Sequence, residues 1–258
     1  MNADGVPIPP SGLGELATVS LDELNAMAAL QTRVDRKYIV PPSVFGPMLS
    51  TLAPRYRVLE IDGCQQFGYQ SVYFDTVDLD LYQAAATGRR RRYKVRTRTY
   101  VDSQLCMLEV KTKGGRGHTS KHRMRYQTGD PSHLNRQAQQ FVSDIVGGTP
   151  DGLAQALTTG YDRSTLVDPI SATRLTIDRN LTCTDWAGSG VTLDAAIIET
   201  KSSSAPSPAD HWLWEQGIRP AKISKFCTGL AAIHSELRSN KWHRALAERW
   251  APTPAAGL

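Results

Sequence analysis

The sequence predicts an α+β fold in which antiparallel strands form a sheet with one strongly cationic face. The main observation is the segment 89–125, which holds thirteen Lys or Arg and two acids, a net charge of +11 in a chain of net charge +5. Its cations recur at every second position, and the side chains of a strand alternate between the two faces of a sheet. Short turns at 101–103 and 114–117 separate the three basic runs. The segment therefore predicts three strands joined by hairpins.

The predicted strands carry nearly all of their charged residues on one face. The residues that share this face are Arg90, Arg92, Lys94, Arg96 and Arg98, then Glu109, Lys111 and Lys113, then Lys121, Arg123 and Arg125. A solvated outer face is the usual meaning of alternating charge. However, solvated faces mix signs, and like charges on neighbouring strands repel each other. We therefore expect an anionic ligand on this face.

Size and composition are those of an ordinary globular protein. The chain has 258 residues, of which 40% are hydrophobic and 21% charged, enough for a sizeable core. No apolar run approaches the ~20 residues that span a bilayer, and no signal peptide opens the chain. The four cysteines are widely scattered without metal-site spacing, which indicates reduced thiols. We expect a cytoplasmic protein.

Helices and strands are predicted to alternate around the basic segment. A capping box at Ser20–Glu23 and a Ser207-Pro208 start each predict a helix. Further helices are predicted from residue 43 to before Pro54, over 76–82, 131–146 and 151–159, and toward the C-terminus. Strands are predicted over 32–40, 67–75, 170–179 and 191–201. The expected organisation is a flexible lead-in over 1–19, a single domain over 20–250 and a tail over 251–258.

Glycine-rich phosphate loops are absent from the sequence. Neither GxxxxGK[ST] nor GxGxxG occurs, and the six histidines show no metal-like spacing. Any phosphate chemistry must therefore depend on side chains. Arg offers a bidentate fork to phosphate and Lys a compact point charge, so a mixture of the two suits a chain of phosphates.

Two carboxylates lie on cationic strand faces. Glu109 precedes Lys111 by two residues, and Glu199 precedes Lys201 by two residues, so each pair shares a face. Such a carboxylate could hold Mg²⁺ or Mn²⁺ when phosphate oxygens complete the coordination shell. An ion pair along the strand explains each one equally well. Asp178 could assist the metal, but an ion pair with a facing Arg is its expected role.

Eight short motifs follow one another in the order of a known family. They are Asp35-Arg-Lys-Tyr38, Val72-Tyr-Phe-Asp-Thr76, Lys94-Val-Arg-Thr-Arg-Thr-Tyr100, Leu108-Glu-Val-Lys-Thr-Lys113, Lys121-His-Arg123, Arg174, Ile198-Glu-Thr-Lys201 and Lys222-Ile-Ser-Lys-Phe226. In this order the chain resembles the VTC (vacuolar transporter chaperone) domain, one of the triphosphate tunnel metalloenzymes related to CYTH proteins. The resemblance runs from about residue 33 to residue 230.

The resemblance implies an eight-stranded antiparallel β-barrel tunnel with flanking helices. It implies a transferase that moves the γ-phosphate of ATP to a growing polyphosphate chain with Mn²⁺ or Mg²⁺. The residues implied to contact triphosphate or product are Lys37, Arg96, Arg98, Lys111, Lys121, Arg123, Arg174, Lys201, Lys222, Ser224 and Lys225. Of these, Lys37, Arg96, Arg98, Lys111 and Lys225 are the candidates for catalysis. Glu199 matches the metal-binding glutamate of the family, and Glu109 is the second candidate for the metal.

The sequence leaves several functions open. Arg33 and Asp35 stand where CYTH relatives have paired glutamates, and Arg179 is a weaker match. A tunnel triphosphatase differs from a polymerase only in using water as the acceptor. A non-catalytic polyphosphate- or inositol-phosphate-sensing module would act for a membrane-protein partner at the inner face of the membrane. A nucleic-acid partner is not expected, because the basic faces carry few aromatic residues for stacking.

Overall fold

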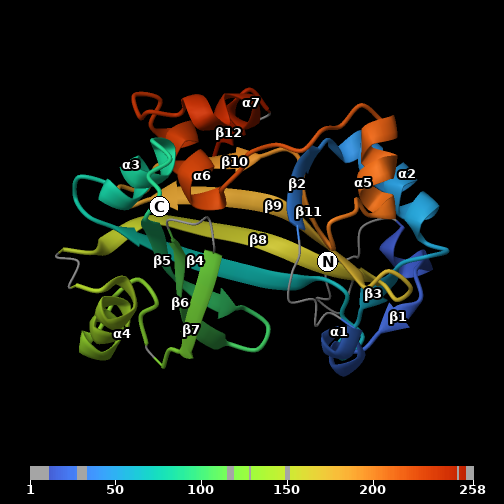
Figure 1. Cartoon of the computed structure of the whole chain (residues 1–258), viewed down its shortest axis with the longest axis horizontal. Coiled ribbons are helices and arrows are strands. Elements are labelled where there is room, and N and C mark those ends of the chain that lie inside the picture. Colours follow the sequence, from blue (N-terminus) through green and yellow to red (C-terminus); the bar gives the residue numbers. More distant parts are fainter. Residues whose placement is uncertain are drawn as a thin grey trace. The chain divides into compact units, whose positions relative to one another are not determined.

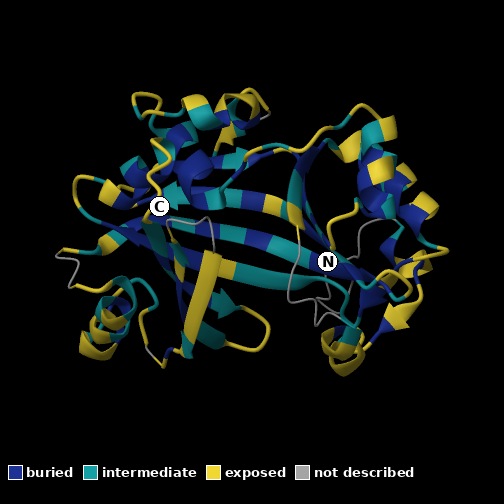
Figure 2. Cartoon of the chain, in the orientation of Figure 1, coloured by how far each residue is buried: buried dark blue, intermediate teal, exposed yellow. Residues whose placement is uncertain are grey.

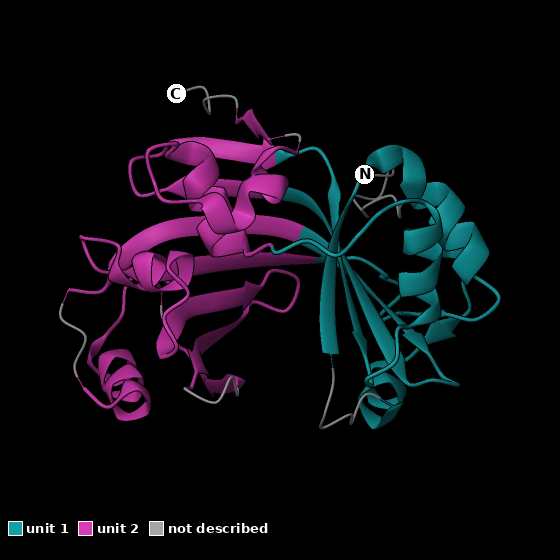
Figure 3. Cartoon of the chain, turned by 45° about the horizontal axis from the view of Figure 1, so that its top comes forward, with its two compact units in different colours: residues 1–67, 162–181, 193–222 teal, residues 68–161, 182–192, 223–258 magenta. Residues whose placement is uncertain are grey.

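The computed structural model describes residues 12–27, 34–114, 119–127, 129–148, 152–248 and 250–253. Arg33 and most of the predicted 114–117 turn lie outside these ranges, as do the first eleven residues and the end of the tail. The chain divides into two compact units, shown in different colours in Figure 3. Unit 1 takes residues from 1–67, 162–181 and 193–222, and unit 2 takes residues from 68–161, 182–192 and 223–258. The prediction of a single domain over 20–250 stays a prediction.

Unit 1 combines strands with helices that cover one face of them (Figure 1). Its strands are β1 (Thr18–Val19), β2 (Val34–Val40), β3 (Arg57–Leu59) and β11 (Ala196–Ser202), with parts of β8 (Ala154–Asp168) and β9 (Thr173–Asp185). Its helices are η1 (Leu13–Glu15), α1 (Leu21–Met27), α2 (Pro42–Leu52) and α5 (Pro208–Glu215). β11 lies between β2 and β9 and is antiparallel to both.

The two faces of the unit 1 strands differ in chemistry. On one face, Tyr38, Ile198 and Leu175 are buried together with apolar residues of α2 and α5. On the other face, the register places Glu199 directly opposite both Lys37 and Thr176. Since directly opposed residues of antiparallel strands share a face, the packed core leaves a polar face on the other side.

Unit 2 holds the three strands of the basic segment. Its strands are β4 (Phe67–Asp75), β5 (Arg92–Tyr100), β6 (Leu105–Lys113), β7 (Thr119–Arg125), β10 (Gly190–Leu193) and β12 (Trp250–Pro252), with the remaining parts of β8 and β9. Its helices are α3 (Asp80–Ala86), α4 (Arg136–Val146), α6 (Lys225–Ile233), η2 (Asn240–Trp242) and α7 (His243–Leu246). Strands β4, β5, β6 and β7 pair antiparallel in that order.

The register in unit 2 separates an apolar face from a cationic one. Val95, Leu108 and Val110 are fully buried and pack in one cluster with Ala138 and Val142 of α4. The opposite face carries Arg96, which lies across from Glu109 on β6 and Tyr73 on β4. The edge strand β7 is exposed along nearly its whole length (Figure 2). The hairpin prediction and its alternation of faces are therefore confirmed.

The fold class is confirmed as α+β with antiparallel strands and flanking helices. The structure departs locally from the predictions. The predicted helix over 151–159 is wrong, because residues 154–168 form the long strand β8. Pairing with neighbouring strands there overrides the helix propensity of Leu-Ala-Gln-Ala-Leu, as tertiary context commonly does. The short pair β1–β3 is parallel. Both predicted helix starts are confirmed, at Ser20 and at the buried capping box of Ser207 and Asp210.

Candidate functional site

The cationic face of unit 2 is assembled by strand register. Alternation places one side chain in two on this face, and pairing then aligns the four strands. The residues on it are Tyr69, Ser71 and Tyr73 of β4, Lys94, Arg96 and Arg98 of β5, Glu109 and Lys111 of β6, and Lys121 and Arg123 of β7. The structure therefore brings five of the predicted phosphate contacts onto one strand face: Arg96, Arg98, Lys111, Lys121 and, at its margin, Arg123.

Arg96 is the best-anchored cation of this face. Its Nε and Nη2 atoms donate to Oε2 of Glu109 at 2.7 and 2.6 Å. Its Nη1 atom donates to the hydroxyl of Tyr73 at 2.9 Å. Two different partners thus fix the plane of the guanidinium. A flexible surface arginine would lack such a fixed orientation.

Glu109 is a buried carboxylate surrounded by positive charge. The residue is 1% exposed, and its Oε1 atom forms an ion pair with Lys121. Burial alone would raise its pKa, but the charges of Arg96, Arg98 and Lys121 lower the pKa to about 2. Glu109 is therefore ionised at neutral pH. It pairs across the strands with Arg96 and Lys121.

Aromatic rings support the neighbouring cations. Arg98 is only 8% exposed, lies over the ring of Tyr69 at 5.6 Å, and donates from Nε to Ser71 at 3.4 Å. Tyr69 stacks on Tyr161 of β8, with ring centroids 5.4 Å apart. The ammonium of Lys225 lies 4.3 Å from the centre of the Tyr161 ring. These cation–π contacts hold the charges of Arg98 and Lys225 without neutralising them.

The amino end of α6 brings a hydroxyl and two amines together. Ser224 caps this helix, because its Oγ accepts the backbone N–H of Cys227 at 3.3 Å. The same Oγ accepts a hydrogen bond of 2.6 Å from the ammonium of Lys94. Lys225 is the first residue of the helix. The predicted pair Ser224 and Lys225 is thus positioned by a cap, and it gains Lys94, to which the sequence assigned no role.

Tyr73 is a buried phenol inside the positive field. Its ring stacks on Phe226, with centroids 5.1 Å apart. Burial would raise the pKa of its hydroxyl, yet the charges of Arg96, Arg98, Lys225 and Lys94 lower that pKa overall. Tyr73 was not among the predicted site residues. Its hydroxyl faces the cluster because Tyr73 lies opposite Arg96 in the strand register.

Unit 1 contains a second cluster, centred on Glu199. One carboxylate oxygen pairs with Lys37 and the other with Lys201. Lys201 also lies 3.6 Å from Asp35 and opposite Arg174 in the register. Burial would raise the pKa of Glu199, but Lys37 and Lys201 hold it well below its usual range. The ion pair between Glu199 and Lys201 that the sequence left open is present.

The surroundings of Glu199 can be tested for their fit to a divalent metal. Thr176 lies directly opposite Glu199, and its buried Oγ1 has no hydrogen-bond partner among the described residues. An oxygen donor without a partner beside a charged carboxylate is the chemistry that Mg²⁺ or Mn²⁺ accepts. In the described part of the chain, no three His, Cys, Asp or Glu side chains converge. Glu199 therefore fits a metal only as one protein carboxylate among phosphate and water oxygens.

Asp178 and Arg163 form the other tight ion pair on this face. Arg163 Nε and Nη2 donate to the two Asp178 oxygens at 2.6 and 2.8 Å. The expected ion pair of Asp178 is confirmed. Arg163 and Tyr161 were missed because β8 was predicted to begin as a helix. The alternation of Thr159, Tyr161 and Arg163 along an extended segment was the signal that could have revealed both residues.

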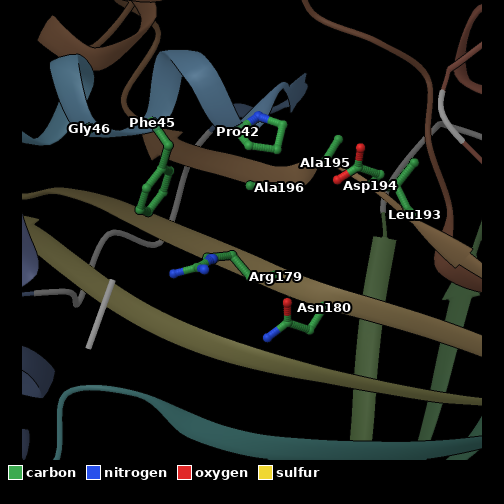
Figure 4. Close-up of a pocket in the computed structure, with 9 residues that line it drawn as sticks. All are labelled: Pro42, Phe45, Gly46, Arg179, Asn180, Leu193, Asp194, Ala195 and Ala196. Atoms are coloured by element: carbon green, nitrogen blue, oxygen red, sulfur yellow. The ribbon is translucent and has the colours of Figure 1, made fainter. Parts of the chain in front are cut away.

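Some predicted residues lie at the margins. Lys111, Arg123 and Lys222 are exposed. Arg179 lies on β9 one residue after Asp178, and so points to the opposite face, where its guanidinium sits 5.3 Å from the ring of Phe45. It lines a cavity of about 280 Å³ beside α2 (Figure 4), together with Asn180, Asp194 and apolar residues. This cavity holds none of the other predicted site residues.

No helix of the described residues is long and apolar enough to cross a membrane. The four cysteines are unbridged, as predicted.

Comparisons with known proteins agree with this geometry. The sequence matches the model of the VTC domain over residues 32–234. The structure is similar to a candidate adenylate cyclase from Bacillus halodurans, with a TM-score of 0.51 and 14% identity over 75% of this chain and 94% of that chain. This likeness shows a shared fold.

A second similar structure is the candidate adenylyl cyclase HpAC1 from Hippeastrum, described as having a dominant triphosphatase activity. It has a TM-score of 0.49 and 18% identity over 76% of this chain and 94% of that chain. A search of curated proteins finds no match.

Proposed function

Because this chain belongs to the VTC domain family, we propose that it is a metal-dependent phosphoryl transferase that adds the γ-phosphate of ATP to a chain of inorganic polyphosphate. Its ligands are ATP, triphosphate and polyphosphate, and its metal is Mn²⁺ or Mg²⁺. A membrane-protein partner and a cytoplasmic location stay predictions.

One observation carries the proposal: several fixed cations surround a single carboxylate in unit 2. Arg96, Arg98 and Lys121 all act on Glu109, and Lys94 and Lys225 act with the two arginines on Tyr73. The single charge of Glu109 cannot neutralise Arg96, Arg98 and Lys121 together. The remaining charge favours a polyanion, and its partial burial makes each contact stronger than it would be on an open surface.

The side chains divide the work by their geometry. Arg96 and Arg98 are held by neighbours, so little freedom is lost when they bind phosphate oxygens. Lys94, Lys121 and Lys225 contribute point charges, and the Ser224 hydroxyl can donate to an oxygen. In unit 1, Lys37 and Lys201 supply positive charge beside Glu199. Positioning and charge neutralisation are the main requirements of phosphoryl transfer.

Glu199 is the residue that we propose for the metal, with Thr176 beside it. When bound, a divalent metal neutralises phosphate oxygens and favours departure of the leaving group. Lys37 and Lys201 keep Glu199 ionised, and each can turn from the carboxylate to a phosphate when a metal arrives. Glu109 is the weaker candidate, because Arg96, which Tyr73 holds in place, donates two hydrogen bonds to one of its oxygens.

Product analysis tests the proposal. Purified protein is incubated with ATP and Mn²⁺, and the products are separated by size and examined by phosphorus NMR. We expect acid-labile phosphate chains longer than triphosphate. ADP and free phosphate as the only products would instead indicate a triphosphatase. Tight tripolyphosphate binding without turnover would indicate a sensing module.

A further inference from the structure

A second group of cations lies at the α3 end of the cationic face of unit 2. Arg92 of β5 is directly opposite Lys113 of β6, and the next pair along the same face is Lys94 and Lys111. Like charges that face each other on neighbouring strands destabilise the pairing. The pair of Arg92 and Lys113 therefore needs an external anion more than the central pair does, because in the central pair Glu109 lies opposite Arg96.

The C-terminal segment adds a further cation to this group. Lys241 belongs to η2, and its ammonium donates to the carbonyl oxygen of Ala85, at the end of α3, at 2.6 Å. The ammonium also lies 5.6 Å from the centre of the Trp242 ring. Burial lowers the pKa of Lys241, and the charges of Arg92, Lys94 and Lys113 lower it further. Arg92 donates to the carbonyl oxygen of Arg89, whose own N–H donates to Ala84, the neighbour of Ala85, so Arg92 and Lys241 are both held by the turn that ends α3. We call Arg92, Lys94, Lys113 and Lys241 the exit cluster.

The exit cluster contains no neutralising carboxylate among the described residues. Arg92 donates to the carbonyl oxygen of Arg89, and Lys94 donates to Ser224 and contacts the sulfur of Cys227. The ammonium of Lys241 contacts the carbonyl oxygen of Ala85 and the ring of Trp242. Neutral partners hold these cations in place while leaving their charge available for a ligand. In the central site Glu109 pairs with two cations, whereas no such carboxylate is described in the exit cluster; Lys94 belongs to both groups.

The exit cluster continues the central site along one strand. Lys94 follows Arg96 and Arg92 follows Lys94 at steps of two residues, each about 7 Å along the strand. We propose that Arg92, Lys94, Lys113 and Lys241 bind the part of a linear polyphosphate that extends beyond a triphosphate held at Arg96 and Arg98. This inference rests on the proposed function and specifies a chain-length preference for it.

The chemistry of the cluster favours polyphosphate over nucleic acid. Single-stranded nucleic acid is usually bound by exposed aromatic rings between the cations. The aromatic rings of this region, Phe226 and Trp242, are buried at 1% and 4% exposure beneath Lys94 and Lys241. They cannot stack with a base. Lys241 also lies beyond residue 234, where the family match ends, so this cation is a feature of the chain outside the matched domain.

The test compares ligands of different length on Lys241→Gln. This change removes one charge but keeps an amide that can donate to Ala85. Arg244→Gln is the matched control, since it removes one charge from an exposed position of the same segment. Affinities for tripolyphosphate and for a longer polyphosphate of defined length are measured by calorimetry at several salt concentrations, with a single-stranded DNA of equal charge as competitor.

We expect wild type to bind the longer chain more tightly and with a steeper salt dependence than tripolyphosphate. Lys241→Gln should lower the affinity for the longer chain about fivefold and leave the affinity for tripolyphosphate unchanged. Arg244→Gln should change neither affinity. Equal effects of Lys241→Gln on both ligands, or none on either, would overturn the exit cluster alone. Competition by DNA would also overturn it. Failure of wild type to bind tripolyphosphate would instead contradict the proposed function.

Discussion

The guanidinium of Arg96 donates twice to one oxygen of Glu109, at 2.7 and 2.6 Å, and a third time to Tyr73. Glu109 is thus both the counter-charge that makes a crowded cationic face stable and the support that orients its central arginine. An ion pair of this kind costs desolvation of both partners, and removing one partner leaves the other charge unmatched. Glu109 therefore contributes both to the stability of the fold and to the orientation of a residue that we expect to bind the ligand.

Glu109→Gln should lower the free energy of unfolding at pH 7 by about 3 kcal/mol. The reason is the drop in the pKa of Glu109 from 4.5 to about 2 on folding. A folded-state pKa below the unfolded value contributes stability that is complete above about pH 4.5 and is lost as the pH falls through about 2. Denaturant unfolding of wild type and variant at pH 7, 4 and 3 should show the two curves converging.

Glu236→Gln is the control for this experiment, because the Glu236 side chain is 72% exposed in the same unit. It should leave the stability and its pH dependence unchanged. A constant difference between wild type and Glu109→Gln from pH 7 to 3 would contradict the assigned role of the Glu109 charge.

Tyr73→Phe should weaken tripolyphosphate binding about tenfold with little loss of stability, because the ring keeps its stacking on Phe226 and only the acceptor for Arg96 is lost. Tyr82→Phe is the matched control: Tyr82 also contacts Phe226, but its hydroxyl donates to the backbone carbonyl of Arg238. Calorimetric titration with tripolyphosphate should separate the two variants. Equal affinities for both would mean that Tyr73 only packs.

The predictions that depend on local alternation in the basic segment were confirmed, whereas contacts between segments far apart in the sequence were not predictable. Period-two alternation over 92–125 specified the strands and their faces, because that signal is local and a slip of one residue would reverse every side chain. The helix predicted over 151–159 failed since β8 is held by partners far away in the sequence. No local pattern could show that Glu109 would pair with Arg96 and Lys121, because both lie on neighbouring strands.

Glu199→Gln should abolish the additional thermal stabilisation that Mn²⁺ gives in the presence of tripolyphosphate. A metal that binds only the folded state raises the stability of that state. Removal of the carboxylate that holds the metal should therefore remove this added stability. Glu215→Gln, an exposed position on α5, should retain it. Melting temperatures are compared with tripolyphosphate alone and with added Mn²⁺. A full metal-dependent increment in Glu199→Gln would show that another group holds the metal.

Asp210→Asn should destabilise the protein by about 2–4 kcal/mol without changing the products of the reaction. Fully buried, Asp210 accepts hydrogen bonds from Tyr38 and Thr200 at one oxygen and from Ser207 at the other. An amide would turn its N–H groups toward some of these donors. Glu23→Gln, in the exposed capping box at Ser20, should cost much less. If chemical denaturation showed the same loss in the free energy of unfolding for both variants, burial of Asp210 would not explain its contribution to stability.

The sequence predicted which types of residue form the candidate site better than it predicted which individual residues belong to it. Lys94 and Ser224 meet only because the cap of α6 is brought to β5. Lys241 belongs to no motif, and its proximity to Arg92 depends on the path of the C-terminal segment. Tyr69, Tyr73 and Tyr161 have the composition of ordinary strand residues, and only the fold shows that their rings support cations.

A crystal structure of the protein with tripolyphosphate and Mn²⁺ tests the central claim most directly. The account predicts phosphate oxygens in contact with Arg96 and Arg98 on the cationic face of unit 2. Phosphate bound instead at the Arg179 cavity or on the exposed Arg89–Arg91 turn, with Arg96 and Arg98 untouched, would contradict it.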